Sequence, residues 1–261
     1  MPKALVNDIE MHYELRGSGK SLLLIHGLGS SGRDWEDFVQ LLPNFQIITI
    51  DLRGHGQTSK PKGPYSIKLF THDIVSLLEF LKIQSTNVLG ISLGGSIALQ
   101  MAIDFPEYVK SITVINAPVE IQVDSFKMKM EALKRSLIVR LVGMKKMGEI
   151  LATRLFVKPE QEDLRKMLIR RWAQNDKKAY LAAMHALMGW SVKAQLHKIK
   201  CPSLIIGSDD DYTPSSIKRE YTALIPDANF IEIKDARHAV SAEKPEELSE
   251  IVRNFIANMN A

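Results

Sequence analysis

A serine lies in a glycine-flanked turn near the middle of the chain, where residues 90–94 read G-I-S-L-G. The short apolar run 88–91 ends at this serine, and a helical pattern over 93–104 follows it, so the motif G-x-S-x-G is expected at a turn from strand to helix. Glycine is needed in such a sharp turn because a side chain would collide across it. The turn therefore predicts that Ser92 is a nucleophile with its hydroxyl exposed at the carboxyl end of the strand.

A serine hydroxyl needs a general base before it becomes a strong nucleophile. Of the seven histidines, His238 is the best candidate, because it follows the last apolar run, 230–233, and precedes a helical pattern at the C-terminus. This position puts it at the same edge of the sheet as Ser92. His55 is interpreted as a turn residue and His26 as a brace for its own loop.

The base in turn needs a carboxylate that fixes its tautomer and stabilises the imidazolium. Asp209, Asp210 and Asp211 follow the apolar run 203–207, so the chain offers serine, aspartate and histidine in that order. Three adjacent aspartates cannot all face one histidine, and at least one is expected to be solvated or to cap a helix.

A tetrahedral intermediate also needs hydrogen-bond donors for its oxyanion. Residues 26–29, which read H-G-L-G, follow the first central apolar run, 22–25. This loop is expected beside the serine turn, so we predict that the backbone N–H groups of Leu28 and Leu93 form the oxyanion hole.

Six short apolar runs, most of them ending in glycine or polar residues, alternate with helical patterns in the parts of the chain that carry these residues. This alternation predicts an α/β fold with a mostly parallel, doubly wound sheet. An antiparallel hairpin is expected over residues 3–15. The runs are 22–25, 47–50, 88–91, 109–115, 203–206 and 230–233, and the helical patterns are 67–82, 93–104, 214–224 and 245–257.

Residues 119–198 break this alternation with successive amphipathic helical patterns at 126–141, 160–174 and 176–188. We therefore predict a core domain formed by residues 1–118 and 199–261, with 119–198 inserted as a helical unit. Residues 121–200 hold 18 Lys and Arg against 7 Asp and Glu, and seven of the 11 methionines. A solvated helical surface is the simpler interpretation of the charge; an acidic substrate, anionic lipid or nucleic acid is the alternative.

Taken in order, these pieces resemble the α/β-hydrolase superfamily over essentially the whole chain. The matching stretches are 26–29, 51–56 (D-L-R-G-H-G), 90–94, 207–214 (G-S-D-D-D-Y-T-P) and 237–238 (R-H). The resemblance implies the α/β-hydrolase fold, with residues 119–198 as a cap over the site. It also implies that the acid stands three residues after the glycine of a G-x-x-D-x-x-x-P pattern, which selects Asp210.

The stretch 54–67 further resembles the serine carboxylesterases and the 3-oxoadipate enol-lactonase-like group, with Thr58 where many members have serine. We therefore expect a carboxylic ester or lactone hydrolase with an acyl-enzyme intermediate and the triad Ser92, Asp210 and His238. A thioesterase or perhydrolase would use the same triad, and a small-molecule receptor on a hydrolase scaffold would retain it. Ser92 argues against haloalkane dehalogenases and epoxide hydrolases, which carry aspartate there.

The composition excludes several other classes. The chain has no H-E-x-x-H motif and no Cys/His cluster, so we expect no metal, and no dinucleotide fingerprint or nucleic-acid motif, so we expect no cofactor and no nucleic-acid partner. No apolar run is long enough for a transmembrane helix. The single cysteine, Cys201, and the absence of a signal-peptide pattern favour a cytoplasmic protein with a small-molecule substrate. The oligomeric state is left open.

Overall fold

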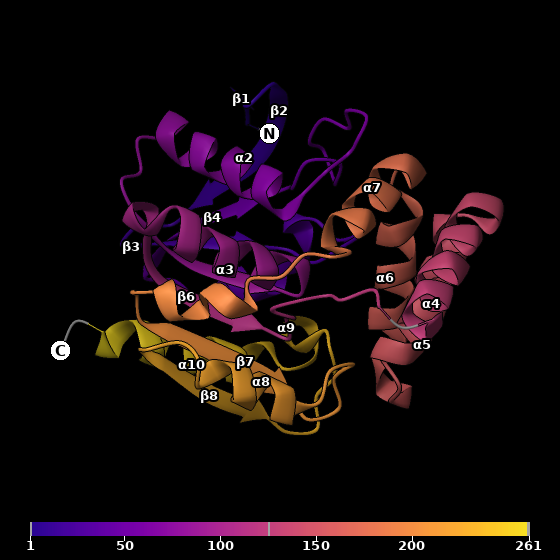
Figure 1. The fold of residues 1–261 in the computed structure, drawn as a ribbon. Helices are drawn as coiled ribbons and strands as arrows, with labels where there is room; N and C mark the ends of the chain where they lie inside the picture. The colour runs from indigo at the N-terminus through magenta and orange to yellow at the C-terminus, as the bar shows by residue number, and fades with distance from the viewer. Residues whose placement is uncertain (1, 125, 260–261) are drawn as a thin grey trace.

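A computed structural model describes residues 2–124 and 126–259. In this part of the chain an eight-stranded sheet has the order β1-β2-β4-β3-β5-β6-β7-β8 (Figure 1). All neighbours from β4 to β8 are parallel, whereas β2 is antiparallel to both β1 and β4. The strands are β1 (Lys3–Val6), β2 (Ile9–Arg16), β3 (Lys20–Ile25), β4 (Phe45–Ile50), β5 (Thr86–Ile91), β6 (Val109–Ile115), β7 (Ser203–Ser208) and β8 (Ala228–Ile233).

Helices cover both faces of this sheet, so its central strands are buried on both sides. Two apolar clusters result: one packs the sheet against α2, α3 and α8, and the other packs it against α1 and α10. The apolar run 88–91 of β5 is typical of this arrangement, and every residue of that strand is buried. The predicted α/β fold with a mostly parallel, doubly wound sheet is therefore confirmed. The helices are α1 (Glu36–Gln40), α2 (Ile67–Phe80), α3 (Leu93–Asp104), α8 (Ser215–Thr222), α9 (Val240–Glu243) and α10 (Pro245–Asn258).

The N-terminal hairpin forms where it was expected, at the edge of the sheet. Asn7 and Asp8 join β1 to β2, with positive φ angles of 44° and 62°. Asparagine and aspartate tolerate this left-handed region better than other residues with a side chain, which explains the tight turn.

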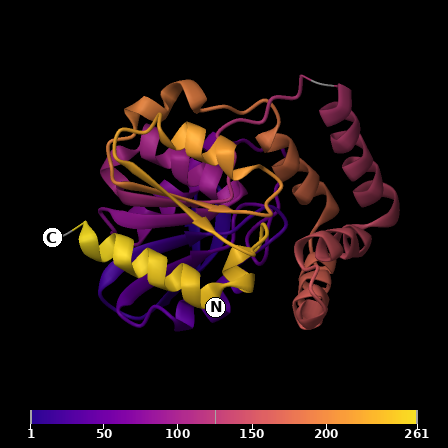
Figure 2. The same cartoon turned by 90° about the horizontal axis from the view of Figure 1, so that it is seen from below.

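Between β6 and β7 the chain leaves the sheet and forms a helical insertion that lies to one side of the core in both Figure 1 and Figure 2. The insertion has its own apolar cluster, which includes Met144, Met147 and Met184. Its two connecting segments run side by side, since Val192 N–H donates to Val119 O and Ile121 N–H donates to Trp190 O. Its elements are α4 (Phe126–Leu137), the π-helical turn η3 (Ile138–Val142), α5 (Met144–Leu155), α6 (Glu162–Ala173) and α7 (Lys177–Leu187).

Among the α-helices described in this insertion, α5 is the one that the sequence patterns did not predict. Within the described residues, no helix combines the length and the hydropathy needed to cross a bilayer.

Candidate active site

The backbone of Ser92 is strained, with φ 55° and ψ −117°, in the turn between β5 and α3. Such a conformation persists only where its surroundings enforce it, and it is concentrated at functional sites. A Cβ at Gly90 would lie 2.2 Å from the carbonyl oxygen of Gly94, and a Cβ at Gly94 would lie 2.2 Å from that of Ile25. Both glycines are therefore required by close backbone contacts, as the motif predicts.

The turn lies at a reversal in the strand order. In the sheet, β4 lies on one side of β3, and β5, the next strand along the chain, lies on the other side of β3. Ligands of open α/β sheets bind in the crevice that such a reversal leaves at the carboxyl ends of the strands. Ser92 stands at this crevice because it directly follows β5.

His238 and Asp211 form a hydrogen-bonded pair at the same edge of the sheet. The Nδ1 atom of His238 lies 2.6 Å from Oδ1 of Asp211, whose side chain is only 1% exposed. The ring of Tyr212 packs on the imidazole, with 4.6 Å between the ring centroids. The histidine is thus held in one orientation by a buried carboxylate and an aromatic ring.

The expectation that Asp210 contacts this histidine is wrong. The Asp210 side chain is 64% exposed, and its Oδ2 accepts a hydrogen bond from Arg237 at 3.1 Å. The carboxylate of Asp209 accepts the backbone N–H groups of Asp235 and Ala236. Successive residues of the turn point in different directions, so only the third of the three carboxylates reaches the imidazole.

Asp211 has a second partner that the sequence analysis missed, the fully buried Lys218 of α8. Lys218 Nζ lies 2.6 Å from Oδ2 of Asp211 and donates to Thr213 O at 2.6 Å. Burial raises the pKa of Asp211, but the hydrogen bonds and charges of His238 and Lys218 outweigh this effect, and the net shift is downward. A lysine in a mostly polar helix gives no sequence signal for such a role.

Asn116, just after β6, ties the histidine loop to the sheet and was also missed. Its Oδ1 accepts the N–H of Ser208 at 2.9 Å, and its Nδ2 donates to Ser208 Oγ at 2.8 Å and to His238 O at 3.2 Å. The side chain therefore links the carboxyl ends of β6 and β7 with the backbone that carries the imidazole. The only hint at this role in the sequence is the position of Asn116 directly after a parallel strand.

The loop after β3 lies beside the serine turn. A Cβ at Gly27 would come within 3.4 Å of Ser92 Cβ. His26 braces this loop: its Nδ1 lies 2.8 Å from Gly27 O, and its Nε2 accepts the Leu52 N–H at 3.0 Å. These partners assign the proton to Nδ1. Leu28 lines the cavity next to Ser92, and the oxyanion role of the Leu28 and Leu93 N–H groups stays a prediction.

His55 packs against the ring of His26 and does not line the cavity. It is fully buried, its ring lies 5.1 Å from that of His26, and its Nδ1 lies 3.0 Å from Arg53 O. Burial, together with the neighbouring His26, lowers the pKa of His55 to about 3. This geometry agrees with the interpretation of His55 as a turn residue.

The protonation of His55 predicts acid destabilisation. The unfolded chain protonates this histidine below its ordinary pKa of 6.5, whereas the folded chain does so only near 3. Between these values the unfolded state holds the extra proton, so the free energy of unfolding should fall as the pH is lowered, by about 1.4 kcal/mol per pH unit. Urea unfolding at a series of pH values would measure this slope, and the variant His55→Gln should show a shallower one. Equal slopes in the two proteins would contradict the assignment.

Ser92 and His238 line one cavity of about 560 Å³ between the core and the helical insertion. The insertion contributes aromatic, aliphatic and methionine side chains together with Arg135 and Arg171, and the core contributes the polar groups near the serine. Trp35 and Trp172 are both in the wall. Wall residues from the insertion include Met128, Arg135, Leu151, Leu155, Phe156, Met167, Leu168, Arg171 and Trp172, and those from the core include Leu28, Ser30, Ile91, Asn116, Tyr212 and Thr213.

Ion pairs attach the insertion to the core beside this cavity. Arg171 of α6 contacts Asp34 at 2.5 Å and Glu36 at 3.2 Å. Within the insertion, Arg135 of α4 donates a hydrogen bond to the hydroxyl of Tyr180 on α7 and so links these two helices. Among the described residues, no group of three or more His, Cys, Asp and Glu side chains could hold a metal ion.

Residues 20–245 match the family described as alpha/beta hydrolase fold. The chain belongs to this family. Similar proteins include 3-oxoadipate enol-lactonase 2 of Acinetobacter baylyi, which is 26% identical over 97% of this chain and 95% of that protein. The (E)-2-((N-methylformamido)methylene)succinate hydrolase of the same organism is 23% identical over 97% of this chain and 96% of its own length.

Among solved structures, the enol-lactonase from Burkholderia xenovorans LB400 superimposes on this α/β hydrolase with a TM-score of 0.91. That structure is 26% identical and covers 98% of this chain and 100% of its own. The similarity therefore extends over the helical insertion as well as the sheet. It supports the family-level resemblance that the motifs indicate.

Proposed function

We propose that this α/β hydrolase cleaves a carboxylic ester or a lactone through an acyl-enzyme on Ser92. One observation carries the proposal: a serine on a strained strand-to-helix turn shares a cavity with a histidine that is fixed by a buried carboxylate. A nucleophile, a base and a group that orients the base are the three parts that acyl transfer requires. The acid of the proposed triad is Asp211.

In the proposed first half-reaction, His238 Nε2 takes the proton of Ser92 Oγ while this oxygen forms a bond with the substrate carbonyl carbon. The oxyanion that results would be held by the Leu28 and Leu93 N–H groups. When the tetrahedral intermediate breaks down, the C–O bond to the leaving group breaks, and the imidazolium returns its proton to the leaving alcohol. Water then repeats the sequence on the acyl-enzyme and releases the acid and the free serine.

The cavity supports a small, mostly apolar substrate. Its volume of about 560 Å³ and its aliphatic and aromatic walls are typical of pockets for small molecules. The enol-lactonases among the similar proteins support an ester or lactone bond as the bond that is cleaved. A thioester or a peracid could react at the same three residues, so rates on matched esters and thioesters should be compared.

The proposal is tested by labelling with a fluorophosphonate, which is attacked by an activated serine and stays bound to it. We expect a single adduct on the peptide that contains Ser92, together with loss of p-nitrophenyl butyrate hydrolysis in proportion to the label. Mass spectrometry of the digested protein locates the adduct. Labelling of a different residue, or full labelling without loss of hydrolysis, would contradict it. Labelling of Ser92 in a protein that turns over no ester, lactone or thioester would favour the receptor alternative.

A further inference from the structure

Helix α4 has two faces of different character. Met128 and Arg135 point to the catalytic cavity and line it. The opposite face carries a stripe of apolar side chains that are exposed to solvent. Phe126, Leu133 and Leu137 are 78%, 50% and 45% exposed, and Leu141 in the following turn η3 is 78% exposed. The spacing of seven, four and four residues puts them on one side of the helix.

Basic residues flank this stripe. Residues 126–142, which form α4 and η3, contain five Lys and Arg and one acidic residue, Glu131, for a net charge of +4. At 100° per residue, Lys129 and Arg140 fall on one side of the stripe and Lys134 on the other. Within the part of the chain that the structure describes, neither Lys129 nor Arg140 forms an ion pair with a carboxylate.

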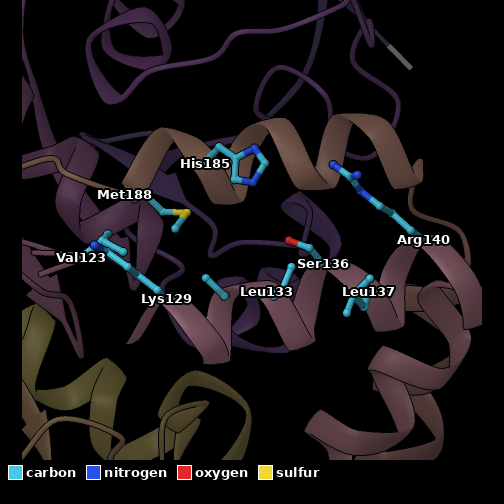
Figure 3. A pocket seen from close by; sticks show the side chains of 9 residues that line it. Val123, Lys129, Leu133, Ser136, Leu137, Arg140, His185 and Met188 are labelled. Atoms are coloured by element: carbon cyan, nitrogen blue, oxygen red, sulfur yellow. The ribbon is translucent and has the colours of Figure 1, made fainter. Parts of the chain in front are cut away.

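A groove of about 280 Å³ runs along the stripe between α4 and α7 (Figure 3). Its floor is apolar, with Val123, Leu133 and Met188 among its residues. Lys129 and Arg140 lie toward opposite ends of the groove in Figure 3, and His185 of α7 faces α4 from across it. A groove of this kind offers apolar volume with positive charge at its ends.

We propose that α4 and η3 form an interfacial segment that docks this protein on a lipid surface rich in anionic headgroups. An amphipathic helix with an apolar stripe between lysines and arginines is the type that lies in the plane of such a surface. The apolar stripe enters the boundary between headgroups and acyl chains, and the flanking cations contact the anionic headgroups. The groove accepts part of an acyl chain.

The charge favours a lipid surface over a second copy of the chain. A symmetric contact between two copies of this segment would bring two charges of +4 face to face, because both copies present the same patch. A bilayer with anionic lipids offers an apolar interior to the exposed stripe and negatively charged headgroups to the flanking cations. Docking through this face also brings the catalytic cavity near the lipid, because the inner side of the same helix lines that cavity.

Sedimentation with vesicles tests the proposal without any measurement of catalysis. The wild-type protein should pellet with vesicles of phosphatidylcholine and phosphatidylglycerol, and much less with phosphatidylcholine alone or at high salt. Lys129→Glu and Arg140→Glu should each weaken binding by at least about fivefold, since each cation near an anionic surface contributes about that factor. Leu137→Glu should also weaken binding, because it puts a carboxylate into the middle of the apolar stripe. Circular dichroism and unfolding curves would show that these surface variants remain folded.

Two matched substitutions far from α4 serve as controls. Leu5→Glu changes an exposed leucine that is 76% accessible on β1, and Lys68→Glu changes an exposed lysine on α2. Neither should alter vesicle binding beyond the small effect of the total charge. Equal losses in the controls and the α4 variants, or no binding of the wild-type protein, would overturn the proposal. A wild-type dimer that Leu137→Glu converts to a monomer, without vesicle binding, would assign the stripe to a second copy instead.

Discussion

Replacement of Ser92 by alanine is expected to lower kcat for p-nitrophenyl butyrate by about 10⁴-fold or more, with little change in KM or stability. The reason is that alanine removes the attacking oxygen but leaves the cavity walls and the His238–Asp211 pair in place. The substitution also keeps the strained backbone turn, whose geometry depends on Gly90 and Gly94. Steady-state hydrolysis over a range of substrate concentrations separates the two constants.

Ser241→Ala provides the matched control for this experiment. Ser241 lines the same cavity but belongs to the short helix α9 and not to the turn that holds Ser92. Its removal should change the rate by no more than a small factor. Comparable rates for Ser92→Ala and the wild-type enzyme would reject the proposed nucleophile, and comparable losses in Ser92→Ala and Ser241→Ala would point to a general disturbance of the cavity.

Replacement of Asp211 by asparagine is expected to lower kcat by on the order of 10⁴-fold, whereas Asp210→Asn should change it only severalfold at most. The asparagine would no longer stabilise the imidazolium of His238 or hold the proton-accepting tautomer. In contrast, Asp210 contributes an exposed contact with Arg237, and surface ion pairs of this kind stabilise by about 0–1 kcal/mol. Parallel kinetics on the two variants and on Asp209→Asn measure the difference directly.

The loss of activity in Asp211→Asn must be separated from a loss of folding. The substitution leaves the buried Lys218 without its carboxylate, and breaking a buried pair on one side costs about 3–5 kcal/mol. The double variant Asp211→Asn with Lys218→Met removes both charges and should regain much of this stability. It should not regain activity. Recovery of activity together with stability would show that Asp211 acts only on the fold, and a larger loss in Asp210→Asn would restore the original assignment.

These aspartates show why the sequence predicts the serine turn but not the carboxylate that contacts His238. The order of strands and turns is a local property, so G-x-S-x-G after an apolar run identifies Ser92, and a histidine after the last strand identifies His238. The choice among Asp209, Asp210 and Asp211 depends on side-chain directions within one turn. A spacing rule carried over from a resemblance selects Asp210, and the structure places Asp211 against the imidazole instead.

The helical insertion illustrates the same limit on a larger scale. Helical periodicity predicts several of its helices, but its boundaries as a separate domain stay a prediction. Contacts between distant segments, such as the ion pair of Arg171 with Asp34, decide which part of the insertion packs on the core and which part stays exposed. Sequence periodicity shows that α4 is amphipathic, but the structure alone shows that its apolar stripe faces outward, with Met128 and Arg135 turned toward the cavity.

By itself, the sequence of this α/β hydrolase determined the fold class, the serine turn and the position of the histidine, because these depend on local periodicity, glycine spacing and chain order. Only the tertiary structure decided that Asp211 faces His238, that Lys218 is buried behind it, and that Asn116 ties the histidine loop to the sheet. These contacts join residues on different strands and loops. Their formation depends on how the ends of β6, β7 and β8 meet at one edge of the sheet, and no local pattern encodes that meeting.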